Sequence, residues 1–364
     1  MIYGERIRQA REYCGLTQLG LAKGIGVNQS SIAHIENGRN VPSMEILKLI
    51  SERTGFLPSF FEKEPTVDFP LGSLVFRARS SLSAQEFNQA HQHARVLFEQ
   101  VKEMSGKLNI PSVRLPVTPE DPSKAARVTR ANLGLSPDLP IKNLIKTIEK
   151  KGVLVLVIPI VLKKIDAFST WVDLESETPL IVISAGKPTD RLRFSVAHEL
   201  GHLVMHQVHK GWFSQLEKDA DKFAADFLLP GTAMKQVLVS PITLTSVARL
   251  KLRWGVSMQA LIRRARDLDL ITNRQYRYLF EQLSARGWRK REPSNLDLPE
   301  EKPQLVAKMI EEVYGSSNPL KEYATDMSLS FNRAIELTRG HISQKITLEP
   351  YRVSPEEMLK YSRN

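Results

Sequence analysis

The pattern of apolar and polar positions predicts helices over most of the chain and a small sheet near its middle. Residues 83–106 carry apolar side chains at helical spacing, and this face packs either on the rest of the chain, which we favour, or on a second chain. Residues 153–158 form an unbroken apolar run of strand length, and residues 168–172 and 179–184 have the composition of two further strands. We therefore expect a mostly helical α+β protein.

Prolines and glycines divide the chain into four parts. Residues 1–64 predict an all-α domain of five helices, and residues 65–122 predict a helical connector with a proline-marked linker. Residues 123–291 predict a small sheet with helices and a helical extension, whereas residues 292–364 predict one or two helices without recognisable chemistry. The strand at 180–183 leads almost directly into the next helix, and it lies either at the edge of the sheet or inside it.

Composition narrows the class of protein. The 364 residues are 42% hydrophobic and 25% charged, as in globular proteins, and Cys14 is the single cysteine, which excludes an internal disulfide. No apolar run approaches the ~18 residues that span a membrane, and the first residues lack an apolar secretion segment. We expect a cytoplasmic protein without membrane contact.

The formal net charge of +11 is unevenly distributed. Residues 1–64 hold eight Lys/Arg and seven Asp/Glu, whereas residues 241–291 hold twelve against three, an excess of nine positive charges. Such a stretch suits nucleic acid or an acidic protein, although most charge runs are solvated helical faces. Residues 250–264 also have the pattern of two helices joined by a turn, so a second nucleic-acid contact is one interpretation.

Residues 17–38 predict two short helices joined by a tight turn. Thr17 can cap the first helix, Gly26 marks the turn, and Val27 fills the angle before the second helix. Outward side chains of the second helix can reach base edges, and polar residues beside the pair can contact phosphates. The candidate DNA-binding residues are Gln18, Gln29, Ser30, Ser31, His34, Asn37 and Arg39.

This segment resembles the Xre/Cro-type, lambda-repressor-like DNA-binding family over residues 5–57. The resemblance is carried by Gly15-Leu16-Thr17-Gln18, Leu21-Ala22, Gly26-Val27 and Ile35-Glu36-Asn37-Gly38. Gly20 stands where the family usually has a helix former, which costs that helix about 1 kcal/mol. The resemblance implies binding to a double-stranded DNA operator by a homodimer on paired half-sites.

His198 and His202 lie four residues apart, within His198-Glu199-Leu200-Gly201-His202, and so share one helical face. That spacing lets both imidazoles reach one zinc ion at about 2.0–2.1 Å. Glu199 then lies where it can take a proton from a water that the ion activates. His206 is about 12 Å of helix beyond His198, so we interpret His206 and His209 as helix-end residues rather than ligands.

The third ligand is expected on the next helix, residues 215–229. Glu217 falls inside the apolar arc of this helix and Asp221 at its edge. An unpaired carboxylate in an apolar arc is costly, and a metal ion in front of it removes that cost. We therefore predict Glu217 as the third ligand and Asp221 as acceptor of the second ring N–H of a liganding histidine. Asp219 or Asp221 is the alternative ligand.

The surrounding residues extend these motifs. The run from Arg193 to His206, followed by Glu217-x-x-Ala220-Asp221 and Leu228-Leu229-Pro230, resembles the ImmA/IrrE family of zinc metallopeptidases over about residues 120–290. The resemblance implies a zincin-like peptidase domain. It also implies these roles: zinc ligands His198, His202 and Glu217, and general base Glu199.

These features predict a transcriptional regulator that binds an operator and carries a zinc-dependent endopeptidase domain, which cleaves a partner regulatory protein. One alternative is a non-proteolytic repressor whose metal site is structural or sensory. Another is an antitoxin-like regulator that neutralises a small partner and represses their shared promoter. The presence of Glu199 beside the first histidine favours the peptidase.

Overall fold

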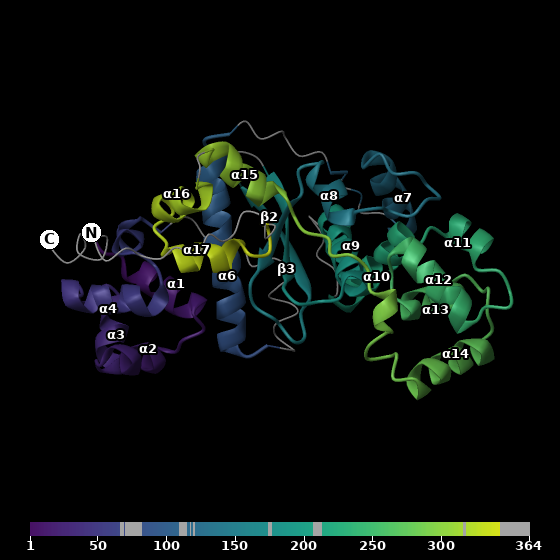
Figure 1. Cartoon of the computed structure of the whole chain (residues 1–364), viewed down its shortest axis with the longest axis horizontal. Coiled ribbons are helices and arrows are strands. Elements are labelled where there is room, and N and C mark those ends of the chain that lie inside the picture. Colours follow the sequence, from purple (N-terminus) through teal and green to yellow (C-terminus); the bar gives the residue numbers. More distant parts are fainter. Residues whose placement is uncertain are drawn as a thin grey trace.

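The computed structural model describes residues 1–65, 69, 82–108, 115–116, 118, 121–173, 177–206, 213–315 and 318–342. The N-terminal helices lie at one end of an elongated molecule, the sheet near its middle, and α10 to α14 toward the other end (Figure 1). The prediction of a mostly helical α+β fold is confirmed. None of the described helices is both long enough and apolar enough to cross a bilayer.

The five predicted N-terminal helices are present. They are α1 (Gly4–Tyr13), α2 (Gln18–Ile25), α3 (Gln29–Glu36), α4 (Met44–Thr54) and the 3-10 helix η1 (Pro58–Glu62). The Thr17 hydroxyl accepts the Gly20 backbone N–H at 3.0 Å and begins α2. Gly26 ends α2 at φ 73°, a conformation that glycine adopts without a steric penalty. This geometry turns the chain sharply into α3.

The long connector helix is α6 (Ala84–Ser105). A capping box fixes its start, because the Ser83 hydroxyl accepts the Glu86 N–H while the Glu86 carboxylate accepts the Ser83 N–H. Its apolar face packs within this chain, against α1, β1 and α15, as we favoured. Much of the predicted proline-marked linker, including Pro111 and Pro119, lies outside the described residues.

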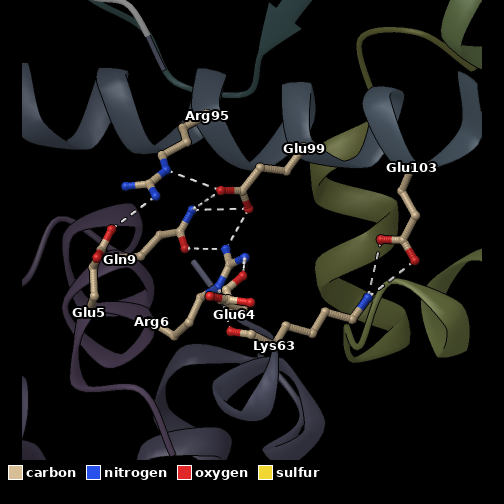
Figure 2. A network of polar contacts seen from close by, with 8 residues as sticks. All are labelled: Glu5, Arg6, Gln9, Lys63, Glu64, Arg95, Glu99 and Glu103. Carbon is tan, nitrogen blue, oxygen red and sulfur yellow. Dashed lines mark hydrogen bonds and ion pairs between the residues drawn. The ribbon is translucent and has the colours of Figure 1, made fainter. Parts of the chain in front are cut away.

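A polar network joins the N-terminal helices to α6 (Figure 2). The Arg6 guanidinium donates to the Glu99 carboxylate at 2.6 Å and to the Gln9 side-chain carbonyl at 2.7 Å. Arg95 on α6 donates to Glu99 at 3.1 Å and to Glu5 on α1 at 3.0 Å. Arg6 and Arg95 are buried, so the network fixes how α1 sits on α6.

The sheet contains β1 (Leu154–Ile158), β2 (Ala167–Asp173) and β3 (Glu177–Ser184), in the order β1-β3-β2. β3 pairs parallel with β1 and antiparallel with β2. β3 is therefore the inner strand, and the alternative that placed residues 180–183 at the edge is wrong. One face, with Leu156 and Val182, packs toward α6; the other, with Val155 and Ile181, packs toward α9. The sheet thus separates two hydrophobic cores. The first core contains α6 and the N-terminal helices, and the second core contains α9.

The helices beside the second core position the candidate metal site. They are α7 (Pro122–Asn132), α8 (Leu144–Glu149), α9 (Thr189–Met205), α10 (Phe213–Leu228), α11 (Gly231–Val237), α12 (Leu244–Trp254), α13 (Met258–Asp267) and α14 (Asn273–Ala285). α9 contacts β2, β3, α7 and α10. The two helices that the sequence predicted within residues 250–264 correspond to the end of α12 and the beginning of α13.

The chain then returns to the first core. It passes through η2 (Ser294–Leu296), α15 (Leu305–Tyr314), α16 (Pro319–Asp326) and α17 (Phe331–Thr338). One or two helices were predicted in residues 292–364, but the described part contains three α-helices, because α16 and α17 are separated at Ser328, which takes a positive φ of 58°. Leu329 bridges to Phe56, and Arg333 donates to the Thr54 carbonyl at 2.6 Å. Beyond α17, the buried His341 ring accepts the Val157 N–H at 3.0 Å.

Candidate metal centre

The two motif histidines lie on one face of α9 and point toward each other. Their Nε2 atoms are 3.0 Å apart. His198 is only 6% exposed, and the His202 side chain is 11% exposed, so both rings are largely withdrawn from solvent. The i, i+4 spacing of an α-helix produces this juxtaposition, because residues four apart lie one turn above each other.

Glu217 on α10 completes the cluster. Its Oε1 lies 3.0 Å from His202 Nε2, and its Oε2 lies 3.6 Å from His198 Nε2. The three groups offer ligand atoms that all lie within 4.8 Å of one another. Ligands at about 2.0–2.1 Å from a tetrahedral ion are about 3.4 Å apart, so this arrangement fits one zinc ion.

The donor set itself also fits a cation. Two imidazole nitrogens and a carboxylate converge, and the nitrogen of a neutral ring that bears no hydrogen carries a lone pair. Nitrogen and oxygen ligands in this number are typical of zinc sites that retain an open position. The residues present therefore suit a three-ligand zinc centre.

Further side chains hold the two imidazoles in place. Asp221 Oδ1 lies 2.8 Å from His198 Nδ1, on the far side of that ring from the cluster. His206, which caps the C-terminus of α9, has its Nδ1 2.9 Å from His202 Nδ1. Partners of this kind fix the tautomer and orientation of a liganding histidine. The sequence pattern suggested the position of Asp221 but gave His206 no such role.

The alternative acid on α10 is engaged elsewhere. Asp219 accepts a hydrogen bond from Gln215, one turn earlier on the same helix, at 2.9 Å. Asp221 bonds to the outer nitrogen of His198 rather than joining the cluster. The structure therefore brings Glu217, and neither of the two aspartates, to both histidines.

Glu199 lies fully buried between α9 and the sheet. Its Oε2 accepts a hydrogen bond from the Ser169 hydroxyl at 2.7 Å. Ser169 is on β2, on the sheet face that packs toward α9, and it pairs with Ile181 of β3. Nothing in the local sequence around Ser169 indicates this contact, because it depends on how β2 pairs and packs.

A glycine permits the close approach of α9 and α10. A Cβ atom on Gly201 would lie 2.9 Å from Cδ1 and 3.1 Å from Cγ of the buried Phe223 ring. These distances are shorter than the 3.5–4.0 Å of a favourable carbon contact. The absence of a side chain at Gly201 therefore lets α10 lie near enough for Glu217 to reach the histidines.

Buried ion pairs connect α9 to later segments of the chain. Arg193 donates to the Glu301 carboxylate, and Glu301 also accepts the backbone N–H groups of Leu144 and Ile145 at 2.7 and 3.1 Å. At the start of α9, Asp190 binds the buried Lys251 of α12. These contacts hold α9 against α8 and α12.

The candidate DNA-binding residues lie mainly on the surface of α2 and α3. Gln29, Ser30, His34 and Arg39 are exposed, whereas Ser31 is half-buried. Two of the others have partners: Gln18 donates to Glu36 at 2.8 Å, and Asn37 accepts from Arg8 at 2.8 Å. The buried Glu36 is also held by Arg11 at 2.5 Å. These contacts fix the turn and leave the outer face of α3 open.

Comparison with known proteins finds a family match in each of two parts of the chain. Residues 7–61 match the helix-turn-helix family, and residues 148–266 match the IrrE N-terminal-like domain. A curated relative is described as the uncharacterized HTH-type transcriptional regulator YazB of Bacillus subtilis (strain 168). It is 43% identical over 47 residues, which cover 13% of this chain and 68% of that protein.

Proposed function

We propose that this chain binds a DNA operator and cleaves a partner protein with a zinc-dependent endopeptidase site. The chain belongs to the helix-turn-helix transcriptional regulators and also carries an IrrE N-terminal-like domain. The cluster of His198, His202 and Glu217 beside Glu199 is the observation that carries the enzymatic half of the proposal. The open face of α3 supports the DNA-binding half.

In the operator complex, α3 enters the major groove. Gln29, Ser30 and Ser31 at its start, and His34 one turn later, supply hydrogen-bonding groups for base edges. Gln18, Asn37 and Arg39 flank the helix and contact phosphates. A homodimer would present two such helices to paired half-sites.

At the metal centre, His198, His202 and Glu217 would hold a zinc ion, and Asp221 and His206 orient the two rings. Zinc bound there would lower the pKa of a water molecule to about 7 and polarise the carbonyl of a peptide bond. Glu199 accepts the proton of the attacking water and passes it to the departing amine. Ser169 positions the Glu199 carboxylate through its hydrogen bond.

The test compares wild type with Glu199→Gln, which retains the shape of the side chain but is a poor base. Both proteins are loaded with zinc and incubated with proteins that copurify with the chain, and cleavage is followed by mass spectrometry. We expect full zinc content in both and loss of cleavage by about 10²–10⁴-fold in the variant. Asp219→Asn is the matched control, because Asp219 lies on α10 but outside the cluster.

A second candidate is a regulator in which the metal site senses or stabilises without cleaving. The complete burial of Glu199 and its bond to Ser169 favour this candidate, because a base in this state must be uncovered before it can act. Cleavage by wild type but not by Glu199→Gln supports the peptidase. Indistinguishable results with every copurifying partner would instead support the sensor, or an antitoxin-like binding role.

A further inference from the structure

Helices α12, α13 and α14 lie at the end of the molecule opposite α2 and α3 (Figure 1), and they and the segment after them carry many exposed cations. Of the twelve Lys/Arg in residues 241–291, Lys251 and Arg264 are buried in ion pairs and Arg266 pairs with Asp269, which leaves nine. The nine are Arg249, Arg253, Arg263, Arg274, Arg277, Arg286, Arg289, Lys290 and Arg291. All nine are exposed, and within the described ranges no carboxylate pairs with any of them. The basic stretch therefore is a surface and not a set of internal ion pairs.

The helices that carry this surface repeat the turn of the N-terminal pair. α2 ends at Gly26 (φ 73°, ψ 29°), and α12 ends at Gly255 (φ 68°, ψ 36°). In each case one valine follows, and the next residue caps the second helix in extended conformation: Asn28 (φ −78°, ψ 147°) before α3 and Ser257 (φ −66°, ψ 154°) before α13. α12 and α13 thus form a second helix-turn-helix unit by backbone geometry.

The segment 286–291 is fixed beside the start of α13. The Gln259 amide donates to the Arg289 carbonyl at 3.1 Å, and the Glu292 carboxylate accepts the Met258 N–H at 2.9 Å. The Arg289 guanidinium lies over the Phe280 ring at 5.4 Å, which holds the side chain without neutralising its charge. The segment therefore presents its cations from a defined position.

We propose that α12, α13, α14 and residues 286–291 form a second nucleic-acid contact, which binds the phosphate backbone of a duplex without reading its sequence. Eight of the nine cations are arginines, whose planar guanidinium matches a phosphate group with two hydrogen bonds. A duplex is favoured over an acidic protein because, on the proposed function, the chain already binds DNA through α2 and α3. One protomer would then hold duplex at two separated places.

The start of α13 explains why this contact is independent of sequence. The first residue of α3, Gln29, is exposed and can reach a base edge. The corresponding residue of α13, Met258, is buried, and the amide of Gln259 is occupied by the Arg289 carbonyl. α13 thus offers charge but few free groups for base edges, which is the pattern of a backbone-binding surface.

The test uses the full chain and a duplex of random sequence of about 40 base pairs, with binding followed by fluorescence anisotropy between about 50 and 200 mM NaCl. The variant replaces Arg289, Lys290 and Arg291 with glutamine. The matched control replaces Lys142, Lys146 and Lys150, three exposed lysines in and beside α8, so that the reduction in net charge is identical. Circular dichroism and zinc content verify that both variants fold.

We expect the first variant to bind more weakly and to lower the slope of log K against log salt by about 0.9 for each phosphate that it no longer neutralises, hence by up to about 3. The control should keep the wild-type slope. Equal slopes in the two variants would overturn the proposal. Unchanged duplex binding by the first variant, with weaker binding to polyglutamate, would also overturn it and assign the surface to acidic proteins. The DNA site on α3 is intact in every protein compared, so a difference in slope between the two variants reports on the second contact alone and does not depend on whether α3 binds an operator.

Discussion

The packing of α9 on α10 makes Gly201→Ala a sensitive test of how the metal centre is built. The added methyl group would lie 2.9, 3.1 and 3.3 Å from Cδ1, Cγ and Cβ of Phe223. A carbon contact is favourable at about 3.5–4.0 Å, and the ring is fully buried, so it has no room to rotate away. We expect this steric clash to be relieved by a shift of α10 of about 0.5–1 Å.

This shift acts on stability and on metal binding in different degrees. Overpacking costs about 1–3 kcal/mol, while alanine gains about 1 kcal/mol of helix propensity over glycine, so the net loss of unfolding free energy is between about zero and 2 kcal/mol. Glu217 is on the same helix as Phe223 and moves with it. Because metal–ligand distances tolerate only about 0.2 Å, we expect zinc affinity to fall by about 10–100-fold, comparable to removal of an outer partner.

Competition with a chromophoric chelator measures the zinc affinity, and urea denaturation measures the unfolding free energy. Gly20→Ala is the matched control, because Gly20 also lies inside a helix, but on α2, where an added Cβ would meet only Thr17 at 3.2 Å and Leu16 at 3.9 Å. The control should bind zinc as wild type does. Wild-type zinc affinity in Gly201→Ala would refute the claim that this close approach positions Glu217.

Three further predictions concern the surroundings of the site. Asp221→Asn should lower zinc affinity by about 10–100-fold, because the outer nitrogen of His198 loses a charged acceptor; an unchanged value in chelator competition would show that Asp221 has no such role. Glu301→Ala should cost about 3–5 kcal/mol of unfolding free energy, since it leaves Arg193 charged and buried; a reduction below about 1 kcal/mol in urea would contradict this. Burial lowers the pKa of His341 from 6.5 to about 4, so between these pH values the unfolded chain binds a proton that the folded chain does not. The unfolding free energy should therefore decrease as the pH is lowered from about 6.5 to about 4, by up to about 3 kcal/mol. His341→Leu should make the unfolding free energy depend less on pH in this window.

The parts of the metal centre that depend on helical period were predictable from the sequence. His198 and His202 come together because residues four apart share a face, and Glu217 stood out because its helix places a carboxylate in an apolar arc. The bounds of the predicted helices were also close to those observed, because Thr17 and Ser83 are strong N-caps.

The parts that depend on tertiary pairing were not predictable. Ser169 reaches Glu199 only because β2 pairs with β3 and packs on α9, and no residue near Ser169 in the sequence signals this. The inner position of β3 has the same origin, since pairing on both edges is not encoded within one strand. The split between α16 and α17 occurs without glycine or proline, at Ser328 in a positive φ conformation. There the bridge from Leu329 to Phe56 outweighs local helix propensity.

Zinc binding by wild type and Glu217→Ala, with X-ray absorption at the zinc edge, tests the convergence of the two helices most directly. The wild type should bind about one zinc per chain, with two imidazole nitrogens and a carboxylate oxygen at about 2.0–2.2 Å. The variant should bind zinc far more weakly and lose the carboxylate contribution. Full zinc content in Glu217→Ala with an unchanged absorption spectrum would contradict this assignment, because α10 would then contribute no ligand through Glu217.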